Sequence, residues 1–233
     1  MNKNGMDTKE WQALIDSLEE LIPRYNFVNR LITFGFDEYW RSIAAKYADK
    51  NDIILEIGSG PGTFANHVFV KEYICLDPSE EMLELSKKKL KNRENIKFVH
   101  GTAENIPFEK NHFTKVFSVF SFRDFQNKSK AISEITRILK TNGQFIILDI
   151  GKPTNPVANF LLTFYISSIV PCFTSIFFDD KRKNPYTLFV DTYQALAPWD
   201  YYISLMGSKG LVLIEKRVLP PLGAYLVILE KRA

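Results

Sequence analysis

The hydrophobic residues near the N-terminus recur at helical spacing. One face of a helix is predicted by residues at offsets of three, four, seven and eleven from the first: Trp11, Leu14, Ile15, Leu18 and Ile22. Pro23 would end that helix. Two shorter helices are expected over 25–34 and 37–47, divided by Gly35, with Asp37 suited to cap the second. Helices therefore precede the first expected strand.

After residue 52 the pattern changes to short apolar runs that alternate with amphipathic stretches. The apolar runs predict strands over 53–57, 73–76, 96–99, 115–119, 144–150, 211–218 and 224–230. Helical spacing predicts helices over 79–91, 128–140 and 200–206. Alternation of this kind implies right-handed crossovers between parallel strands. We expect an α/β fold with a Rossmann-like, doubly wound, seven-stranded sheet that is mainly parallel, ends in an antiparallel C-terminal hairpin and is preceded by N-terminal helices.

Composition and charge narrow the class of protein. The 233 residues are 45% hydrophobic and 24% charged, enough to bury a large core. The formal net charge is +3 and the basic residues are mostly scattered, so nucleic acid is not an expected partner. Cys75 and Cys172 have neither metal-site spacing nor nearby histidines, which argues against a disulfide framework or a metal site. The polar N-terminus has no signal-peptide core, and a cytoplasmic protein is expected.

Residues 157–178 form a tract of 22 residues without a charge. Length alone would permit a membrane span. Polar residues and a proline dilute the tract, however, and both of its ends must lie on one side of a globule: Asn159, Thr163, Ser167, Ser168, Pro171, Thr174 and Ser175. A buried or pocket-covering lid is therefore favoured over a span. A peripheral membrane contact and a homodimer interface are the other interpretations that the tract leaves open.

A glycine-rich turn follows the first expected strand, and a helix is expected to begin near Thr63. The turn reads Glu56-Ile57-Gly58-Ser59-Gly60-Pro61-Gly62. Glycines let the backbone turn sharply and approach a ligand closely at the carboxyl end of a strand. The dinucleotide pattern GxGxxG is not met, because its third position falls on Thr63, whereas GxGxG is met. Glu56 suits a cationic ammonium better than a diphosphate, and the amino-acid end of S-adenosylmethionine supplies such an ammonium.

A second acid supports this interpretation. The second expected strand ends at Asp77, where a carboxylate can accept hydrogen bonds from both hydroxyls of a ribose. Taken singly, Glu56 could be a capping or solvated acid, and Asp77 could lie on the N-cap side of the helix after Pro78. Their pairing with the glycine turn makes S-adenosylmethionine, with S-adenosylhomocysteine as its product, the expected cofactor.

At these residues the chain resembles the class I S-adenosylmethionine-dependent methyltransferases, and within them the ubiquinone/menaquinone-biosynthesis C-methyltransferases. The likeness spans about residues 25 to 153. The glycine turn and the Pro107-Phe108 motif are common to many methyltransferases, whereas the Tyr-x-x-x-Asn and Phe-x-x-Arg segments point to the quinone enzymes. The segments that carry this likeness are 25–29 through Trp40-Arg41, 54–60, 101–108, and 120–124 with 137–140.

The resemblance places the cofactor contacts at the ends of the first three strands. It implies Glu56, Gly58, Ser59 and Gly60 for the methionine part, Asp77 and Pro78 for the ribose, Thr102, Ala103 and Glu104 for the adenine, and Tyr25 closing over the cofactor. The family usually has Asp where Thr102 stands, so the adenine contact could be weaker or shifted to Glu104. Asp124 replaces the family's Asn and Ser121 its Gly, beside the expected acceptor pocket, which leaves the acceptor's identity open.

Methyl transfer is an in-line displacement, so much of the rate can come from holding donor and acceptor in line. A carbon acceptor on a quinol ring needs its hydroxyl proton removed, and a cation near the resulting oxyanion would help. Arg123 is the candidate cation, with Asp124 or Tyr25 as a base through water. Arg123 could instead form a surface ion pair with Asp124 or Glu134. No metal is implied.

The acceptor is expected to be a small apolar molecule. Ring C-methylation of a prenylated quinol is the first hypothesis, O- or N-methylation of another hydrophobic small molecule the second, and a non-catalytic methyltransferase-like binding module the third. A single domain is expected, divided into N-terminal helices, a cofactor-binding core, an apolar cover for the substrate, and a C-terminal helix with its hairpin: 1–50, 51–152, 153–197 and 198–233.

Overall fold

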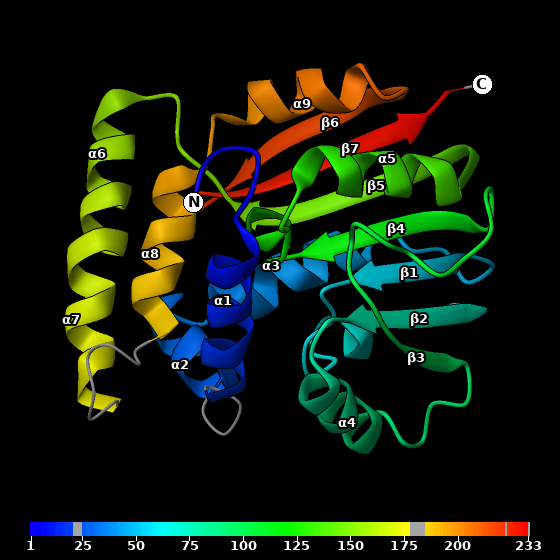
Figure 1. Cartoon of the computed structure of the whole chain (residues 1–233), viewed down its shortest axis with the longest axis horizontal. Coiled ribbons are helices and arrows are strands. Elements are labelled where there is room, and N and C mark those ends of the chain that lie inside the picture. The colour runs from blue at the N-terminus through cyan, green and yellow to red at the C-terminus, as the bar shows by residue number, and fades with distance from the viewer. Residues whose placement is uncertain (21–24, 178–184, 222, 233) are drawn as a thin grey trace.

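Seven strands form one sheet in the computed structural model, which describes residues 1–20, 25–177, 185–221 and 223–232 (Figure 1). Their spatial order is β3-β2-β1-β4-β5-β7-β6. The first five strands run parallel, and β7 is antiparallel to both β5 and β6. The expected mainly parallel sheet with an antiparallel C-terminal hairpin is therefore confirmed. The bounds are β1 Ile53–Ile57, β2 Glu72–Asp77, β3 Ile96–His100, β4 Phe113–Val119, β5 Leu139–Ile150, β6 Leu211–Leu219 and β7 Ala224–Lys231.

Helices flank the sheet and gather at the end towards which β1 and β4 point in Figure 1. In that view α5 lies in front of the sheet and α3 behind it, while α1, α2 and α8 stand beyond the carboxyl ends of the parallel strands. The bounds are α1 Thr8–Glu20, α2 Tyr25–Ile32, α3 Phe36–Ala45, α4 Glu80–Lys89, α5 Lys128–Ile138, α6 Pro156–Phe164, α7 Val170–Thr174, α8 Pro185–Ala195 and α9 Trp199–Gly207.

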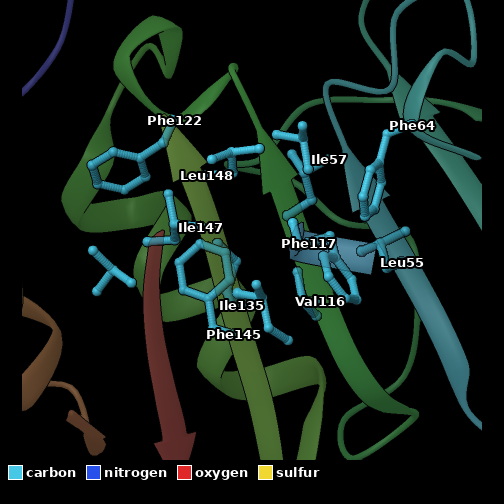
Figure 2. Close-up of a cluster of buried hydrophobic side chains, with 14 of the residues drawn as sticks. Leu55, Ile57, Phe64, Val116, Phe117, Phe122, Ile135, Phe145, Ile147 and Leu148 are labelled. Carbon is cyan, nitrogen blue, oxygen red and sulfur yellow. The ribbon is translucent and has the colours of Figure 1, made fainter. Parts of the chain in front are cut away.

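The core lies between the sheet and these helices. The central strands are apolar along most of their length because helices cover both of their faces. Figure 2 shows side chains of β1, β4 and β5 packed together with Phe64, which follows the glycine turn, and with Ile135 of α5. Phe117 of β4 meets Phe64 with ring centroids 5.2 Å apart. This core fixes the carboxyl ends of β1 and β4 side by side.

The helix expected to begin near Thr63 is present as a short 3-10 helix, Phe64–His67, with Thr63 at its N-cap position. One local expectation was wrong. Asp37 does not cap α3: the N-cap position is Gly35, in the left-handed conformation with φ 78°, and Asp37 is the second residue of the helix, in its first turn. Its carboxylate is occupied by Thr33 and Arg41 instead.

The uncharged tract folds as one interrupted helix. A π-helical turn, Tyr165–Ile169, joins α6 to α7, so the helix runs from Pro156 to Thr174. Asn155 caps its N-terminus by accepting hydrogen bonds from the amides of Val157 and Ala158. The last four residues of the tract fall on the 3-10 turn Ser175–Phe177 and on residue 178, which lies outside the described residues.

Candidate functional site

The first cavity opens at the carboxyl ends of β1 and β2 and is called here the glycine-turn cavity. It encloses about 760 Å³ with its mouth included. Of the residues predicted from the sequence, its wall contains Gly58, Gly60, Asp77, Pro78, Thr102, Ala103, Glu104, Arg123 and Asp124. The cavity therefore brings together residues that are spread over more than sixty positions of the chain.

Gly58 and Gly60 of the turn are glycines for different structural reasons. Gly58 has φ 68°, and a Cβ added there would lie 2.5 Å from Cβ of Ser121, so a side chain is excluded. Gly60 has φ 52°, and an added Cβ would meet no atom within 4 Å. Gly60 therefore presents bare backbone to the open cavity, which fits a ligand that lies against the chain.

Asp77 is held by the same turn. Its carboxylate accepts hydrogen bonds from the amide of Gly60 at 2.7 Å and from the amide of Ser79 at 3.0 Å. Burial raises the pKa of Asp77 to about 6, against the opposing effect of these amides. Two amide donors leave lone pairs on the carboxylate free to accept further hydrogen bonds from hydroxyls in the cavity.

Glu56 lies behind the wall of the glycine-turn cavity. Oη of Tyr73 donates a hydrogen bond of 2.7 Å to its carboxylate, and only 2% of the residue is exposed. Burial raises the pKa of Glu56 to about 8. Ser59 is also buried and is not part of the wall. Direct contact of these two residues with the methionine part of a cofactor stays a prediction.

The far end of the glycine-turn cavity is lined by Pro78, Thr102, Ala103 and Glu104. The carboxylate of Glu104 accepts a hydrogen bond of 2.8 Å from the amide of Asn127. Glu104 thus has a structural partner as well as a place on the wall, and its carboxylate keeps capacity for one more donor.

Helix α1 forms a side of the glycine-turn cavity that the Rossmann core does not supply. Trp11, Ile15 and Leu18, which lie on the apolar face predicted from the sequence, line the cavity. Oγ of Ser79, the N-cap of α4, donates a hydrogen bond of 2.5 Å to Glu19. The apolar face of α1 therefore serves a binding site as well as the core.

A second cavity adjoins the first and is called here the ion-pair cavity. It encloses about 630 Å³, and Leu18, Phe120 and Arg123 line both cavities. Asp37 and Arg41 lie on its wall, joined by an ion pair of 2.7 Å, and both are 6% exposed. Such a buried pair at a cavity wall is a polar recognition element in an otherwise apolar surrounding.

Arg123 is fixed by three neighbours. Its Nη1 lies 2.7 Å from the carboxylate of Asp149, its Nη2 lies 3.3 Å from Asp124, and its guanidinium stacks on Phe189 at 4.9 Å from the ring centroid. The alternative of a surface ion pair is met only in part: Arg123 does pair with Asp124, but both side chains are largely buried, and Glu134 pairs with Arg137 instead. The guanidinium is thus oriented where the two cavities meet.

Burial shapes the charges around Arg123. It raises the pKa of Asp124 to about 6, with Arg123 acting in the opposite direction. It also lowers the pKa of Lys128 to about 8, and Nζ of Lys128 donates a hydrogen bond of 2.8 Å to the carbonyl of Arg123. Asp124 lines the glycine-turn cavity but not the ion-pair cavity.

Phe120 lies between the two cavities in an unusual conformation. It follows β4 with φ 60°, a left-handed value that costs energy in a residue with a side chain. Its amide donates a hydrogen bond of 2.7 Å to the carbonyl of Leu148, and Arg41 stacks on its ring at 4.9 Å. The strain therefore accompanies a position where two ligands would meet.

A third cavity, the apolar cavity, adjoins the second. It encloses about 340 Å³ and shares Ile32, Thr33, Ile150 and Phe189 with the ion-pair cavity. Its remaining wall comes from Trp40 and from the uncharged helix, by Leu162, Tyr165, Ile166 and Val170. The three cavities form a series from a glycine turn, past buried ion pairs, to an apolar chamber.

Sequence reasoning found most of the first cavity and part of the second. It missed Asp149, which is the penultimate residue of the buried strand β5, and the role of Asp37 and Arg41. Four-residue spacing of an acid and a base in one helix was the signal for that pair. The side chain of Tyr25 lies outside the described residues, so its closing role stays a prediction.

The chain is similar in sequence to a family of known proteins. The ubiE/COQ5 methyltransferase family model matches residues 6–220. The chain belongs to the ubiE/COQ5 methyltransferase family. It is 30% identical over 217 residues to the demethylmenaquinone methyltransferase of Chlorobaculum tepidum, covering 89% of this chain and 88% of that protein. It is also 30% identical over 213 residues to the protein of the same name from Thermotoga maritima, with 88% and 90% covered.

Solved structures of methyltransferases share the fold. A possible histamine N-methyltransferase from Thermotoga maritima superposes with a TM-score of 0.65 at 20% identity, covering 94% of this chain and all of that one. At this identity the likeness shows the fold alone. Family and fold together make this ubiE/COQ5 member an enzyme that transfers a methyl group, and membership implies dependence on S-adenosylmethionine in general. The open backbone at Gly60 and the acid Asp77 fit that cofactor.

Proposed function

We propose that this methyltransferase C-methylates the ring of a small prenylated quinol, with the cofactor in the glycine-turn cavity, the ring in the ion-pair cavity and the prenyl chain in the apolar cavity. The observation that carries the proposal is the series of adjoining cavities whose lining changes from polar to apolar. The names of the relatives, demethylmenaquinone methyltransferases, describe acceptors of this class.

The proposed cofactor contacts follow from the wall of the first cavity. Asp77 would accept the ribose hydroxyls, the backbone at Gly60 would lie against the methionine part, and Thr102 with Ala103 would border the adenine. When bound, S-adenosylmethionine supplies an electrophilic methyl group and retains the electrons of the broken C–S bond as a neutral thioether. The apolar side chains of α1 would exclude water from that end of the site.

The proposed acceptor contacts are the two buried ion pairs. Asp37 would accept a hydrogen bond from the ring hydroxyl and then its proton, because its carboxylate has lone pairs beyond those used by Arg41 and Thr33. Arg123 would stabilise the oxyanion that forms as the hydroxyl proton leaves. The electrons of the oxyanion then let the ring carbon form the new C–C bond. The proton of the methylated carbon passes to water, and Asp37 returns its proton to the ring oxygen, so that both hydroxyls are restored. Asp124, which lies on the wall of the glycine-turn cavity, stays a candidate base that would take the hydroxyl proton through a water molecule.

The test is a product analysis with defined acceptors. Purified protein is incubated with S-adenosylmethionine and a reduced naphthoquinol that carries a short prenyl chain, and products are separated by mass spectrometry. We expect one added methyl group on a product that keeps both hydroxyls. A product with one hydroxyl converted to a methyl ether would show O-methylation instead. No methylation of quinols, with methylation of other apolar phenols or amines, would overturn the proposed acceptor.

A further inference from the structure

The uncharged helix has two faces of different exposure. Its inner face is buried on the domain through Leu162, Ile166 and Val170. Oη of Tyr165 also donates a hydrogen bond of 2.6 Å to the carbonyl of Ile32. The outer face carries large apolar side chains exposed to solvent: Val157, Phe160, Leu161, Phe164, Ile169, Phe173 and Ile176. In Figure 1 this helix forms the outermost column of the molecule, beyond α8.

By length and composition the helix Pro156–Thr174 could cross a membrane. Its packing does not fit a span. Val170 lies in one apolar cluster with Val28 and Tyr186, and Leu162 and Ile166 belong to the main core, so the helix is packed on the domain at three successive turns. A helix that is buried on one face and apolar on the other suits a position flat in the interface of a bilayer.

A second element near this helix also exposes apolar side chains. Phe27 and Leu31 of α2 and Phe34 in the following turn are exposed, and the ring of Phe34 lies 6.0 Å from that of Tyr165 in the helix. Two segments distant in sequence thus expose apolar side chains and approach each other at Phe34. Exposed apolar patches mark interaction sites on proteins.

The same helix is also a wall of the apolar cavity. Leu162, Tyr165, Ile166 and Val170 face the cavity, while their neighbours on the helix face outward. We propose that the outer face of the helix Pro156–Thr174, together with Phe34, docks the enzyme on a lipid bilayer, beside the cavity that receives the apolar part of the acceptor. This docking surface goes beyond the proposed function. Its use as a route for a membrane-dissolved acceptor rests on the proposed function.

The polar groups of the tract favour a bilayer over a second copy of the chain. Interfaces between proteins carry a polar rim with hydrogen bonds across it. Several of its hydroxyls are already bonded within the protein: Thr163 contacts Oη of Tyr193 at 3.4 Å, and Ser175 donates to the carbonyl of Cys172 at 2.7 Å. No charged residue lies within the tract. A face without charges suits hydrocarbon.

The test is sedimentation of the full chain with phosphatidylcholine vesicles in high salt, without cofactor or acceptor. Phe160 and Phe164 are 68% and 52% exposed, so the double variant Phe160→Ser with Phe164→Ser should fold normally. We expect wild type to bind and the double variant to bind at least about tenfold more weakly, because two aromatic side chains that the lipid would cover are lost. Phe69→Ser is the matched control, since Phe69 is 72% exposed on the segment before β2. That variant should bind as wild type does.

Three outcomes would overturn the proposal. Wild type could remain in solution, or all variants could bind alike, or wild type could sediment in lipid-free buffer as a dimer that the double variant converts to a monomer. The last result would assign the face to a second copy. Vesicle binding is measured without any methyl transfer, so its failure is distinct from failure of the proposed function. With the proposed function intact, the double variant should lose rate only on acceptors embedded in vesicles.

Discussion

Arg123 and Asp149 form a two-point contact at the end of β5. The carboxylate of Asp149 accepts a hydrogen bond of 2.7 Å from Nη1 of Arg123 and a second of 3.1 Å from the backbone amide of Arg123. Because both the side chain and the backbone are held, the guanidinium has one position relative to the sheet. A cation that stabilises a developing oxyanion works best when it is fixed in this way before the reaction.

Arg123→Lys should therefore reduce kcat strongly. We expect a loss of roughly 10²-fold, because an ammonium cannot keep the two-sided contact with Asp149 and Asp124. The Kd for S-adenosylmethionine should change little, since Asp77 and Gly60 are untouched. Steady-state kinetics and calorimetric titration measure the two quantities. Arg217→Lys, on exposed β6, is the control and should match wild type. An unchanged kcat in Arg123→Lys would remove Arg123 from the mechanism.

Asp77→Asn should weaken S-adenosylmethionine binding by at least about tenfold. The amide that replaces one carboxylate oxygen cannot accept a ribose hydrogen bond, and the lost bond is to a charged group. Calorimetric titration gives the Kd directly. Glu80→Gln, on the first turn of α4 and exposed, is the matched control. Equal affinities of wild type and Asp77→Asn would place the ribose elsewhere.

The same residue sets a pH dependence. Because the pKa of Asp77 is raised to about 6, its carboxylate becomes protonated as the pH falls below that value. Wild type should bind S-adenosylmethionine more weakly as the pH falls through about 6, and Asp77→Asn should lack this step. A wild-type Kd that stays constant between pH 5 and 7 would contradict the assignment; the window follows from a pKa of about 6.

Asp37→Asn should act on the acceptor rather than on the cofactor. The variant cannot accept the hydroxyl proton, and it weakens the ion pair with Arg41, so kcat/KM for a quinol should fall by roughly 10²-fold. Asp124→Asn is the informative comparison, because Asp124 lines only the first cavity of the two. If Asp124→Asn loses as much activity as Asp37→Asn, the base lies on the side of the glycine-turn cavity.

Glu56→Gln should change how stability depends on pH. In the folded protein the pKa of Glu56 is raised to about 8 by burial, while in the unfolded chain it returns to its ordinary value near 4.5. Its protonation therefore contributes stability that is fully present below about pH 4.5 and is lost as the pH rises through about 8. Urea denaturation should show that wild type loses on the order of a few kcal/mol more than Glu56→Gln across this window. Parallel profiles would contradict the pKa shift.

The fold and the first cavity could be predicted from the sequence because they depend on local patterns. The mainly parallel sheet follows from apolar runs that alternate with helical stretches, and Gly58, Gly60 and Asp77 follow from a turn and a strand end. The second cavity depends on long-range packing: Asp37 is on α3, Arg123 follows β4, and Asp149 is on β5. Nothing in their separate neighbourhoods indicates that they meet. Asp37 was assigned to a helix cap for that reason, although its partners lie four residues to either side.

The hydrogen bond from the amide of Gly60 to Asp77 joins two motifs that are 17 residues apart. Each motif therefore depends on the other for its shape: a different backbone at Gly60 would release Asp77, and a different residue at 77 would leave the turn without its anchor. Across relatives the two positions should change together or not at all. Engineering this protein toward another nucleotide would accordingly require both strand ends to be rebuilt at once.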